Sequence, residues 1–282
     1  MKRLLFFIRA YPSNLRLELL LLFLVELIRI SGLRRFFHNY LVESRAILGF
    51  VYERQGLATP QEDGMQLEFV LNQTMVSLVL RWNSSDFLVF SQVFIREEYR
   101  PLTELKQQTP MIIDAGSNIG CTSIYLSTFY KGAKIIAIEP DADNFKQLKK
   151  NFLLSGLRDV SCLSIALWQT DGLVSLTNDF RDHRNWSVKV AEEGNMHVPA
   201  KTLKTILSEF SISQIDILKM DIEGAEETIF ENDNTIFDVL KNVKSIAIEV
   251  HDCKTTVENK LKMLGFDLKF AGETLFVTSR AL

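Results

Sequence analysis

The chain has 282 residues, and 47% of them are hydrophobic, which is enough apolar content for a large buried core. Its formal charge of -3 is unevenly distributed, because residues 1–50 hold eight Lys and Arg against three Glu. The remaining body has 24 basic against 32 acidic residues, a net charge of -8. We expect no nucleic-acid partner, because nucleic acid requires a clustered basic face.

The three cysteines, Cys121, Cys162 and Cys253, are far apart and form no CxxC pair. An odd number of dispersed cysteines is typical of reduced thiols in a cytoplasmic protein. The cysteines therefore predict a cytoplasmic location and no structural zinc site.

The N-terminal segment 1–50 is predicted to be a basic helical extension. Charged residues interrupt the apolar stretch Leu15–Ile30, whose longest uncharged run is Leu19–Val25, far short of the ~20 residues that a membrane span requires. The pattern predicts an amphipathic helix with a narrow polar stripe. Such a helix can lie on the inner face of an anionic membrane, or it can pack against the body or a second copy in a homodimer. No signal peptide is expected.

Residues 51–108 are predicted to be a β-rich lead-in that packs on the catalytic domain. Apolar residues alternate from Met65 to Phe94, with a polar turn at Asn83–Asp86 before the apolar run Phe87–Phe90. This pattern predicts antiparallel strands, including one at Phe87–Phe90.

After Pro110 the pattern changes to strand, turn and helix, which predicts a doubly wound α/β fold over residues 109–282. The predicted sheet strands are Met111–Ile113, Ile135–Ile138, Val160–Ser164, Ile215–Met220 and Ser245–Glu249. The predicted helices are Ile119–Tyr130, one capped by Asp143 that runs to Leu154, and Thr255–Leu264. The chain closes with a predicted antiparallel hairpin, Phe266–Phe270 and Leu275–Thr278.

Polar motifs follow the first two predicted sheet strands. Glycines in Asp114–Gly120 allow a tight turn and close ligand approach, and the following helix offers unpaired N–H groups to an anion. Glu139 ends the next strand, where a carboxylate can accept both hydroxyls of a ribose. The spacing is Gly-x-x-x-Gly and differs from the GxGxxG of a dinucleotide site. Together the two motifs indicate a nucleoside-containing cofactor.

Two more motifs follow the last central strands. Asp221 ends the fourth strand, where a carboxylate can orient an acceptor hydroxyl or remove its proton. Glu223 and Glu226, at the start of the next helix, are expected to stabilise its dipole. Glu249 and His251 follow the last central strand, and an imidazole suits general-base work near neutral pH.

The same carboxylates offer an alternative to base catalysis. Asp221, Glu223, Glu249 and His251 have the oxygen and nitrogen ligands that can bind a divalent cation, which would acidify a bound hydroxyl. Their spacing is typical of no particular metal, so no metal site is predicted and the alternative stays open.

These motifs carry a family resemblance. Asp114–Gly120, Ile138-Glu139-Pro140, Lys219–Glu226 and Ile248–His251 resemble the motif set of FkbM-type S-adenosylmethionine-dependent methyltransferases, and the similarity covers roughly residues 65–280. The resemblance implies the class I methyltransferase fold, a Rossmann-like, seven-stranded and mostly parallel sheet that ends in an antiparallel hairpin.

The resemblance also implies roles for individual residues. The cofactor S-adenosylmethionine would contact the following residues: Asp114, Gly116, Ser117, Asn118, Gly120, Glu139, Ala166 and Asp221. Within this set, the glycine loop would hold the methionine part, Glu139 the ribose, and Ala166 would lie near the adenine. Asp221 would lie nearest the sulfonium methyl.

We therefore predict a methyltransferase that methylates a hydroxyl of a sugar, glycan or small-molecule acceptor, with Asp221, Glu249 and His251 as catalytic residues. The sugar or glycan acceptor comes from family analogy. Two alternatives stay open: a nucleotide-cofactor oxidoreductase, and a non-catalytic scaffold that binds a cofactor or a membrane.

Overall fold

The structure is a computed structural model, and it describes residues 43–82, 84–106, 109–177, 189–191, 196–233, 235–250 and 254–279. The predicted amphipathic helix and His251 lie outside these residues. The described chain divides into two compact units, one through Glu97 with Leu154–Gly156 added, and one made of the rest. The division into 1–50, 51–108 and 109–282 stays a prediction.

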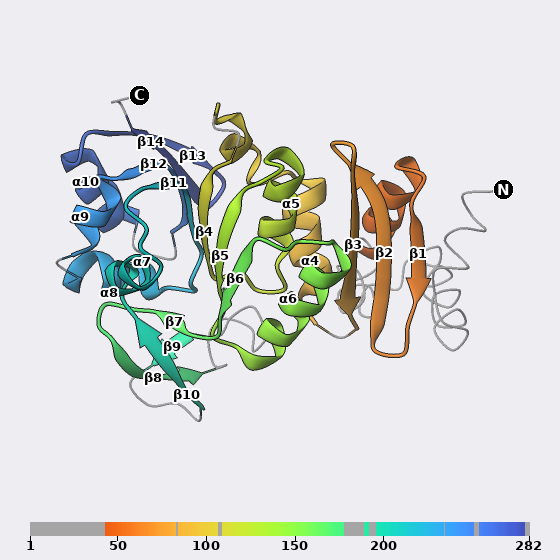
Figure 1. Ribbon diagram of the computed structural model, residues 1–282, viewed down its shortest axis with the longest axis horizontal. Helices are drawn as coiled ribbons and strands as arrows, with labels where there is room; N and C mark the ends of the chain where they lie inside the picture. Colours follow the sequence, from red (N-terminus) through yellow and green to blue (C-terminus); the bar gives the residue numbers. More distant parts are fainter. Residues whose placement is uncertain are drawn as a thin grey trace, which may run out of the picture. The chain divides into compact units, whose positions relative to one another are not determined.

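The first unit combines a helix over residues 43–53 with a three-stranded antiparallel sheet, coloured red to orange in Figure 1. Its strands are β1 (Leu57–Pro60), β2 (Gly64–Leu71) and β3 (Thr74–Arg81). Phe69 of β2 packs edge-on against Phe50 and Phe94, with ring centroids 5.2 and 5.5 Å apart. Aromatic edge-to-face contacts of this kind form the core of the unit.

The predicted strand at Phe87–Phe90 is wrong, because this run forms the helix α4 (Asp86–Phe90), which continues as the π-helix η1 (Ser91–Ile95). Phe87, Phe90 and Phe94 are all buried, and their spacing of three and four residues places them on one helical face. Asp86 anchors the start of this helix by accepting the Arg81 N–H at 2.8 Å. Period alone does not separate a strand from a helix in so short an apolar run.

The second unit is built on a seven-stranded sheet in the order β13-β14-β12-β11-β4-β5-β6. The bounds of its strands are β4 (Met111–Ala115), β5 (Lys134–Ile138), β6 (Val160–Leu163), β11 (Ile215–Met220), β12 (Val243–Glu249), β13 (Phe266–Ala271) and β14 (Thr274–Ser279). β14 runs antiparallel to both of its neighbours, β12 and β13, and the other neighbouring strands in this sheet are parallel. The predicted Rossmann-like fold class, with its terminal antiparallel hairpin, is therefore confirmed.

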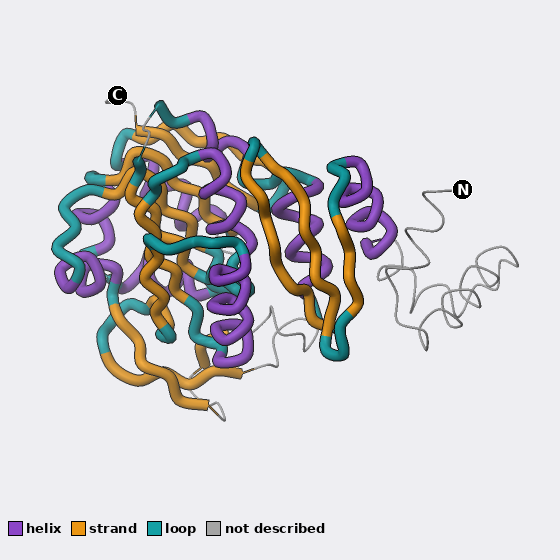
Figure 2. The backbone as a smooth tube through the Cα atoms, turned by 45° about the vertical axis from the view of Figure 1, so that its right-hand side comes forward, coloured by secondary structure: helices purple, strands orange, loops and turns teal. Residues whose placement is uncertain are grey.

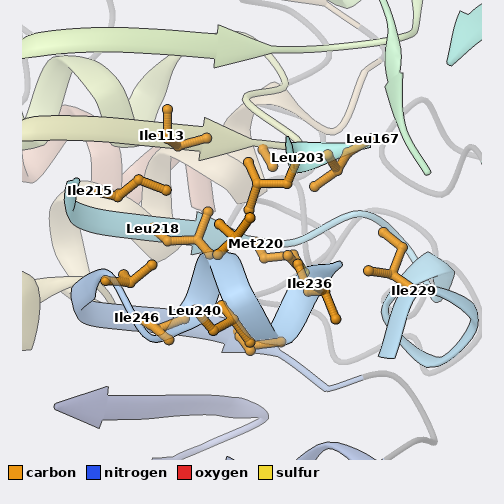
Figure 3. Packing of buried hydrophobic residues seen from close by; sticks show 14 of the residues in the cluster. Ile113, Leu167, Leu203, Ile215, Leu218, Met220, Ile229, Ile236, Leu240 and Ile246 are labelled. Carbon is orange, nitrogen blue, oxygen red and sulfur yellow. The ribbon is translucent and has the colours of Figure 1, made fainter. Parts of the chain in front are cut away.

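Helices cover both faces of this sheet, as Figures 1 and 2 show. One face carries α5 (Cys121–Phe129) and α6 (Ala142–Leu154). The other carries α7 (Leu203–Glu209), α8 (Ala225–Asn232), α9 (Ile236–Leu240) and α10 (Lys254–Met263). On this second face, Ile113, Leu218 and Ile246 of the adjacent strands β4, β11 and β12 belong to one buried cluster (Figure 3). The same cluster includes Ile229 of α8 and Leu240 of α9. Burial on both faces explains why the central strands are almost entirely apolar.

Two local details differ from the sequence prediction. Asp141, and not Asp143, caps α6, because its carboxylate accepts the Asn144 N–H at 2.8 Å. A second sheet, β7-β10-β8-β9, was not predicted. Its strands are β7 (Ala166–Leu167), β8 (Gly172–Thr177), β9 (Lys189–Ala191) and β10 (Met196–Lys201). Strands β7 and β9, with 2 and 3 residues, are too short to give an alternating pattern.

Among the helices that the structure describes, none has both the length and the apolar content needed to cross a bilayer.

Candidate functional site

The glycine loop connects β4 to α5 and presses directly against the turn that follows β11. Gly116 has a φ of +74°, and a Cβ at this position would lie 1.7 Å from the carbonyl oxygen of Asp221. Gly120 has a φ of +87°, and its Cβ would lie 2.5 Å from the ring of Phe152. Only glycine combines this backbone conformation with so close an approach. The loop is therefore held against Asp221 on one side and against α6 on the other.

Ser117 shapes the loop through its own hydrogen bonds. Its hydroxyl donates to the Asp114 carbonyl at 2.6 Å and accepts the Ile138 N–H at 3.0 Å, while its N–H donates to the Ile138 carbonyl at 2.9 Å. This predicted cofactor-binding residue thus ties the loop to β4 and β5.

Glu139 joins the end of β5 to the same loop. Its carboxylate accepts the Asn118 N–H at 2.8 Å and the Asp141 N–H at 2.9 Å. Burial raises the pKa of Glu139 to about 7, and the two N–H donors offset only part of that rise. Glu139, which is 5% exposed as a residue, therefore changes its charge near neutral pH.

Lys219, for which we predicted no role, lies at the centre of the site. Its ammonium donates to the Gly116 carbonyl at 2.6 Å and lies 3.5 Å from Asp114 Oδ1 and 3.4 Å from Asp221 Oδ2. Burial acts to lower the pKa of Lys219, but Asp221, Asp114 and Glu249 outweigh burial and raise it. The sequence did contain a signal for Lys219, because a lysine inside a predicted buried strand requires a partner of opposite charge nearby.

Asp114 is fully buried at the end of β4. One carboxylate oxygen accepts the Ser123 hydroxyl at 2.6 Å, while Oδ1 has no hydrogen-bond partner in the described part of the chain. The ammonium of Lys219 is thus the cation that compensates this buried carboxylate.

Tyr99 approaches Asp221 from the segment before η2 (Arg100–Glu104). Its hydroxyl lies 3.5 Å from Asp221 Oδ2, and the Asp221 N–H donates to the Ala115 carbonyl at 3.1 Å. Burial raises the pKa of Tyr99 well above its usual value, and the charges of Asp221, Glu98 and other carboxylates raise it further. The phenol therefore remains a neutral donor. Tyr99 belongs to the segment that resembles the family, but the sequence indicated no role for it.

The turn after Asp221 begins α8. Glu223 has a φ of +55°, and Gly224 follows it with a φ of +87°. The buried carboxylate of Glu226 accepts the Ile222 N–H at 2.8 Å. Glu226 therefore has the capping role expected of an acidic residue in a first helical turn.

The carboxyl ends of β4, β5 and β11 thus gather most of the predicted site residues, namely Asp114, Gly116, Ser117, Asn118, Gly120, Glu139 and Asp221. Ala166 is buried at the start of β7, where it pairs with Ala200. Glu249 ends β12 opposite Thr274. His251 lies outside the described residues, so its role stays a prediction. Across the described ranges, no group of three or more His, Cys, Asp or Glu is arranged to hold a metal ion.

Comparisons with known proteins match the part of the chain that carries this site. The model of the methyltransferase FkbM domain matches residues 114–268. Methyltransferase sdnD of Sordaria araneosa is 29% identical over 193 residues, which cover 56% of this chain and 74% of that protein. Methyltransferase 1 of Beauveria bassiana is 27% identical over 180 residues, which cover 55% and 71%. Among solved structures, a putative methyltransferase from Streptococcus mutans in complex with SAH has 12% identity and a TM-score of 0.40, covering 65% of this chain and 97% of that one.

Proposed function

Because this chain belongs to the FkbM methyltransferase family, we propose that it transfers a methyl group from S-adenosylmethionine to a hydroxyl of a sugar, glycan or other small-molecule acceptor. Family membership makes it a methyltransferase, and its seven-stranded sheet has the class I methyltransferase fold. The cofactor and the acceptor are the parts that we propose. The family match also removes the reason to favour an oxidoreductase or a non-catalytic scaffold.

One observation carries the proposal: the glycine loop and Asp221 are in direct contact, with no room for a side chain on Gly116. A loop that holds the cofactor and a carboxylate that faces the acceptor must be adjacent, since methyl transfer requires the donor and the acceptor in line. This adjacency supports a transfer reaction at the carboxyl edge of β4 and β11.

The residues present fit S-adenosylmethionine. Gly116 and Gly120 let the loop pack closely against Asp221 and Phe152 beside Glu139. Each Glu139 oxygen, which already accepts one N–H, has a second lone pair for a ribose hydroxyl. When bound, S-adenosylmethionine supplies an electrophilic methyl carbon on a sulfonium. We assign the methionine part to the loop, the ribose to Glu139 and the adenine to the surroundings of Ala166.

The exposure and the contacts of Asp221 support a role for this residue on the acceptor hydroxyl. Its side chain is 23% exposed, in contrast to the fully buried Asp114, so it can meet a substrate from solvent. Lys219 and Tyr99 both face its Oδ2. We propose that Asp221, together with the predicted catalytic residues Glu249 and His251, orients the hydroxyl and takes its proton as the oxygen gains the methyl group.

The charge of the site supports a neutral acceptor. Four carboxylates, those of Asp221, Glu98, Glu249 and Asp114, act on the buried Tyr99, and Lys219 is the cation that lies among them. An anionic acceptor such as a phosphate would be repelled by this surplus of negative charge. A sugar or other polyol hydroxyl fits better.

Binding and turnover assays test the proposal. Calorimetry should detect S-adenosylmethionine and S-adenosylhomocysteine and no NAD, and binding of NAD alone would contradict the proposed cofactor. Turnover on a panel of hydroxylated acceptors should fall in Asp221→Ala and His251→Ala while cofactor binding is kept. Full turnover in either variant would remove that residue from the mechanism. Loss of activity in excess chelator would favour the divalent-cation alternative over base catalysis.

We also propose a cytoplasmic protein whose N-terminal extension contacts either the inner membrane face or a second copy of the chain. Ile47, Leu48 and Phe50 are buried in the core of the first unit, so a test deletion should stop at residue 42. Loss of membrane recovery on fractionation would support the lipid contact. Loss of a dimer on gel filtration would support the homodimer, and no change in either would contradict both.

A further inference from the structure

Lys219 is a buried cation whose contacts link the two parts of the proposed site. Its ammonium donates to the Gly116 carbonyl at 2.6 Å and lies 3.4 Å from Asp221 Oδ2. We propose that Lys219 is a positioning residue, which holds the glycine loop and the Asp221 carboxylate in one arrangement before the cofactor binds. The inference rests on the proposed function only for the identity of the ligand.

Packing does not explain a lysine at this position. Its neighbours on β11, Leu218 and Met220, are fully buried, and the lysine side chain is itself only 3% exposed. Burying an ammonium is costly, and buried ion pairs can often be replaced by apolar side chains without loss of stability. The benefit of a lysine here is therefore the geometry that it imposes on its partners.

The Lys219 side chain extends the connection between β11 and β4 into the glycine loop, beyond the point where backbone hydrogen bonds end. Lys219 pairs across the sheet with Asp114, and the next link between these strands is the Asp221 N–H, which donates to the Ala115 carbonyl at 3.1 Å. Beyond that point the chain leaves β4 and enters the loop. The lysine ammonium bonds the first carbonyl of the loop, that of Gly116, and an ammonium has the three donors needed to serve a carbonyl and two carboxylates.

The surroundings keep the ammonium in place and charged. Carboxylates face it from β4 (Asp114), from the end of β11 (Asp221) and from β12 (Glu249). The ring of Tyr99 lies 5.8 Å from Nζ, measured to its centroid. An aromatic face at this distance attracts a cation.

The experiment compares Lys219→Met with Lys244→Met. Lys244 of β12 pairs with Asp216 of β11 at 2.7 Å near the amino ends of these strands, so this control removes an ion pair of the same strand far from the loop. We expect hydrogen exchange of the 114–124 peptide in the ligand-free protein to accelerate by about tenfold in Lys219→Met and to stay unchanged in Lys244→Met. The affinity for S-adenosylhomocysteine should fall about tenfold in the first variant only.

Lys219→Arg should recover part of both losses, because a guanidinium keeps the charge and can reach the carbonyl. If Lys219→Met does not fold, the double variant Asp114→Asn/Lys219→Met is compared with Asp114→Asn, since both lack the unpaired buried carboxylate. Unchanged loop exchange in a folded variant that lacks Lys219 would overturn the inference. Wild-type protein that fails to bind S-adenosylhomocysteine would overturn the proposed cofactor instead, and loop exchange would still decide the role of Lys219.

Discussion

Strand β11 carries a charged residue near each end, and the two ends differ in what the ion pair does. Near the amino end, Asp216 pairs with Lys244 at 2.7 Å and also accepts the Met111 N–H at 2.7 Å. Near the carboxyl end, Lys219 is shared between Asp114 and Asp221 at 3.5 and 3.4 Å and donates to a loop carbonyl. The first arrangement fastens neighbouring strands together, whereas the second fastens a strand to a loop.

The two ion pairs therefore differ in whether a ligand can reach one of the partners. Lys244 is 20% exposed and its pair is satisfied by two fixed strands. Lys219 is 3% exposed, yet one of its partners, Asp221, is 23% exposed. The carboxyl end thus combines a buried cation with an accessible carboxylate, and this is the carboxylate that we propose acts on the acceptor.

The largest expected difference between the two ends concerns turnover. Asp221→Asn should lower turnover by about 10² to 10⁴ while leaving the affinity for S-adenosylhomocysteine within a few-fold, because the amide cannot take a proton. Asp216→Asn, the matched change at the other end, should leave turnover intact and cost about 1–3 kcal/mol of the free energy of unfolding. Steady-state rates with an acceptor found in the panel, and denaturant unfolding, measure the two effects. Equal turnover in both variants would contradict the assignment of Asp221.

A second prediction concerns two glycines that share a left-handed backbone. Gly116→Ala should lower the affinity for S-adenosylhomocysteine by about a hundredfold or more, because its Cβ would lie 1.7 Å from the Asp221 carbonyl and displace the loop. Gly265, which precedes β13, has a φ of +81° with nothing within 4 Å of an added Cβ. Gly265→Ala should therefore cost only about 1–2 kcal/mol of stability and leave binding unchanged. Calorimetry on both variants gives the comparison, and similar binding losses would show that the loop contact is not special.

The third prediction uses the pH dependence of Glu139. Its pKa is 4.5 when unfolded and about 7 in the folded protein, so the folded state binds the proton more tightly. The stability that this proton contributes is complete below pH 4.5 and is lost as pH rises to about 7, a change of about 3 kcal/mol. Glu139→Gln, which resembles the protonated form, should flatten this part of the stability curve.

Binding should show the opposite trend, because the ionised carboxylate is the better acceptor for ribose hydroxyls. The affinity of the wild-type protein for S-adenosylhomocysteine should rise as pH passes through about 7, whereas Glu139→Gln should bind weakly at every pH. Denaturant unfolding and calorimetry over this range measure both trends. A wild-type protein with the same pH profile as the variant would contradict the assignment.

The smallest effects are expected for lysines outside the site, and they calibrate the Lys219→Met result. Lys241 pairs with Asp238 on the surface, with side chains 59% and 73% exposed, so Lys241→Met should change stability by less than about 0.5 kcal/mol. Lys244→Met, at a pair whose side chains are 20% and 9% exposed, should cost about 1–3 kcal/mol. Thermal unfolding measures both, and a larger loss in Lys241→Met would show that exposure does not rank these pairs.

Sequence patterns predicted the central sheet well, because strands buried on both faces leave an unambiguous apolar run. Ile215–Met220 was predicted with the bounds that β11 has, and the closing hairpin was predicted as well. Short segments were less predictable. Phe87–Phe90 was predicted to be a strand and forms a helix, because a four-residue apolar run fits either period. The sheet β7-β10-β8-β9 was not predicted at all, and its strands β7 and β9 have only 2 and 3 residues.

The order of strands, helices and polar motifs along the chain by itself determined the fold class and the edge at which the site forms, because the carboxyl ends of parallel strands meet on one side of a sheet. Only the tertiary structure decided that Lys219 and Tyr99 belong to the site. It also decided that the Ser117 hydroxyl bonds the ends of β4 and β5 and so fixes the loop to them. Strand ends can be placed from local periodicity, but the partner of a buried charge lies on another strand. That partner becomes known only when the strands are brought together.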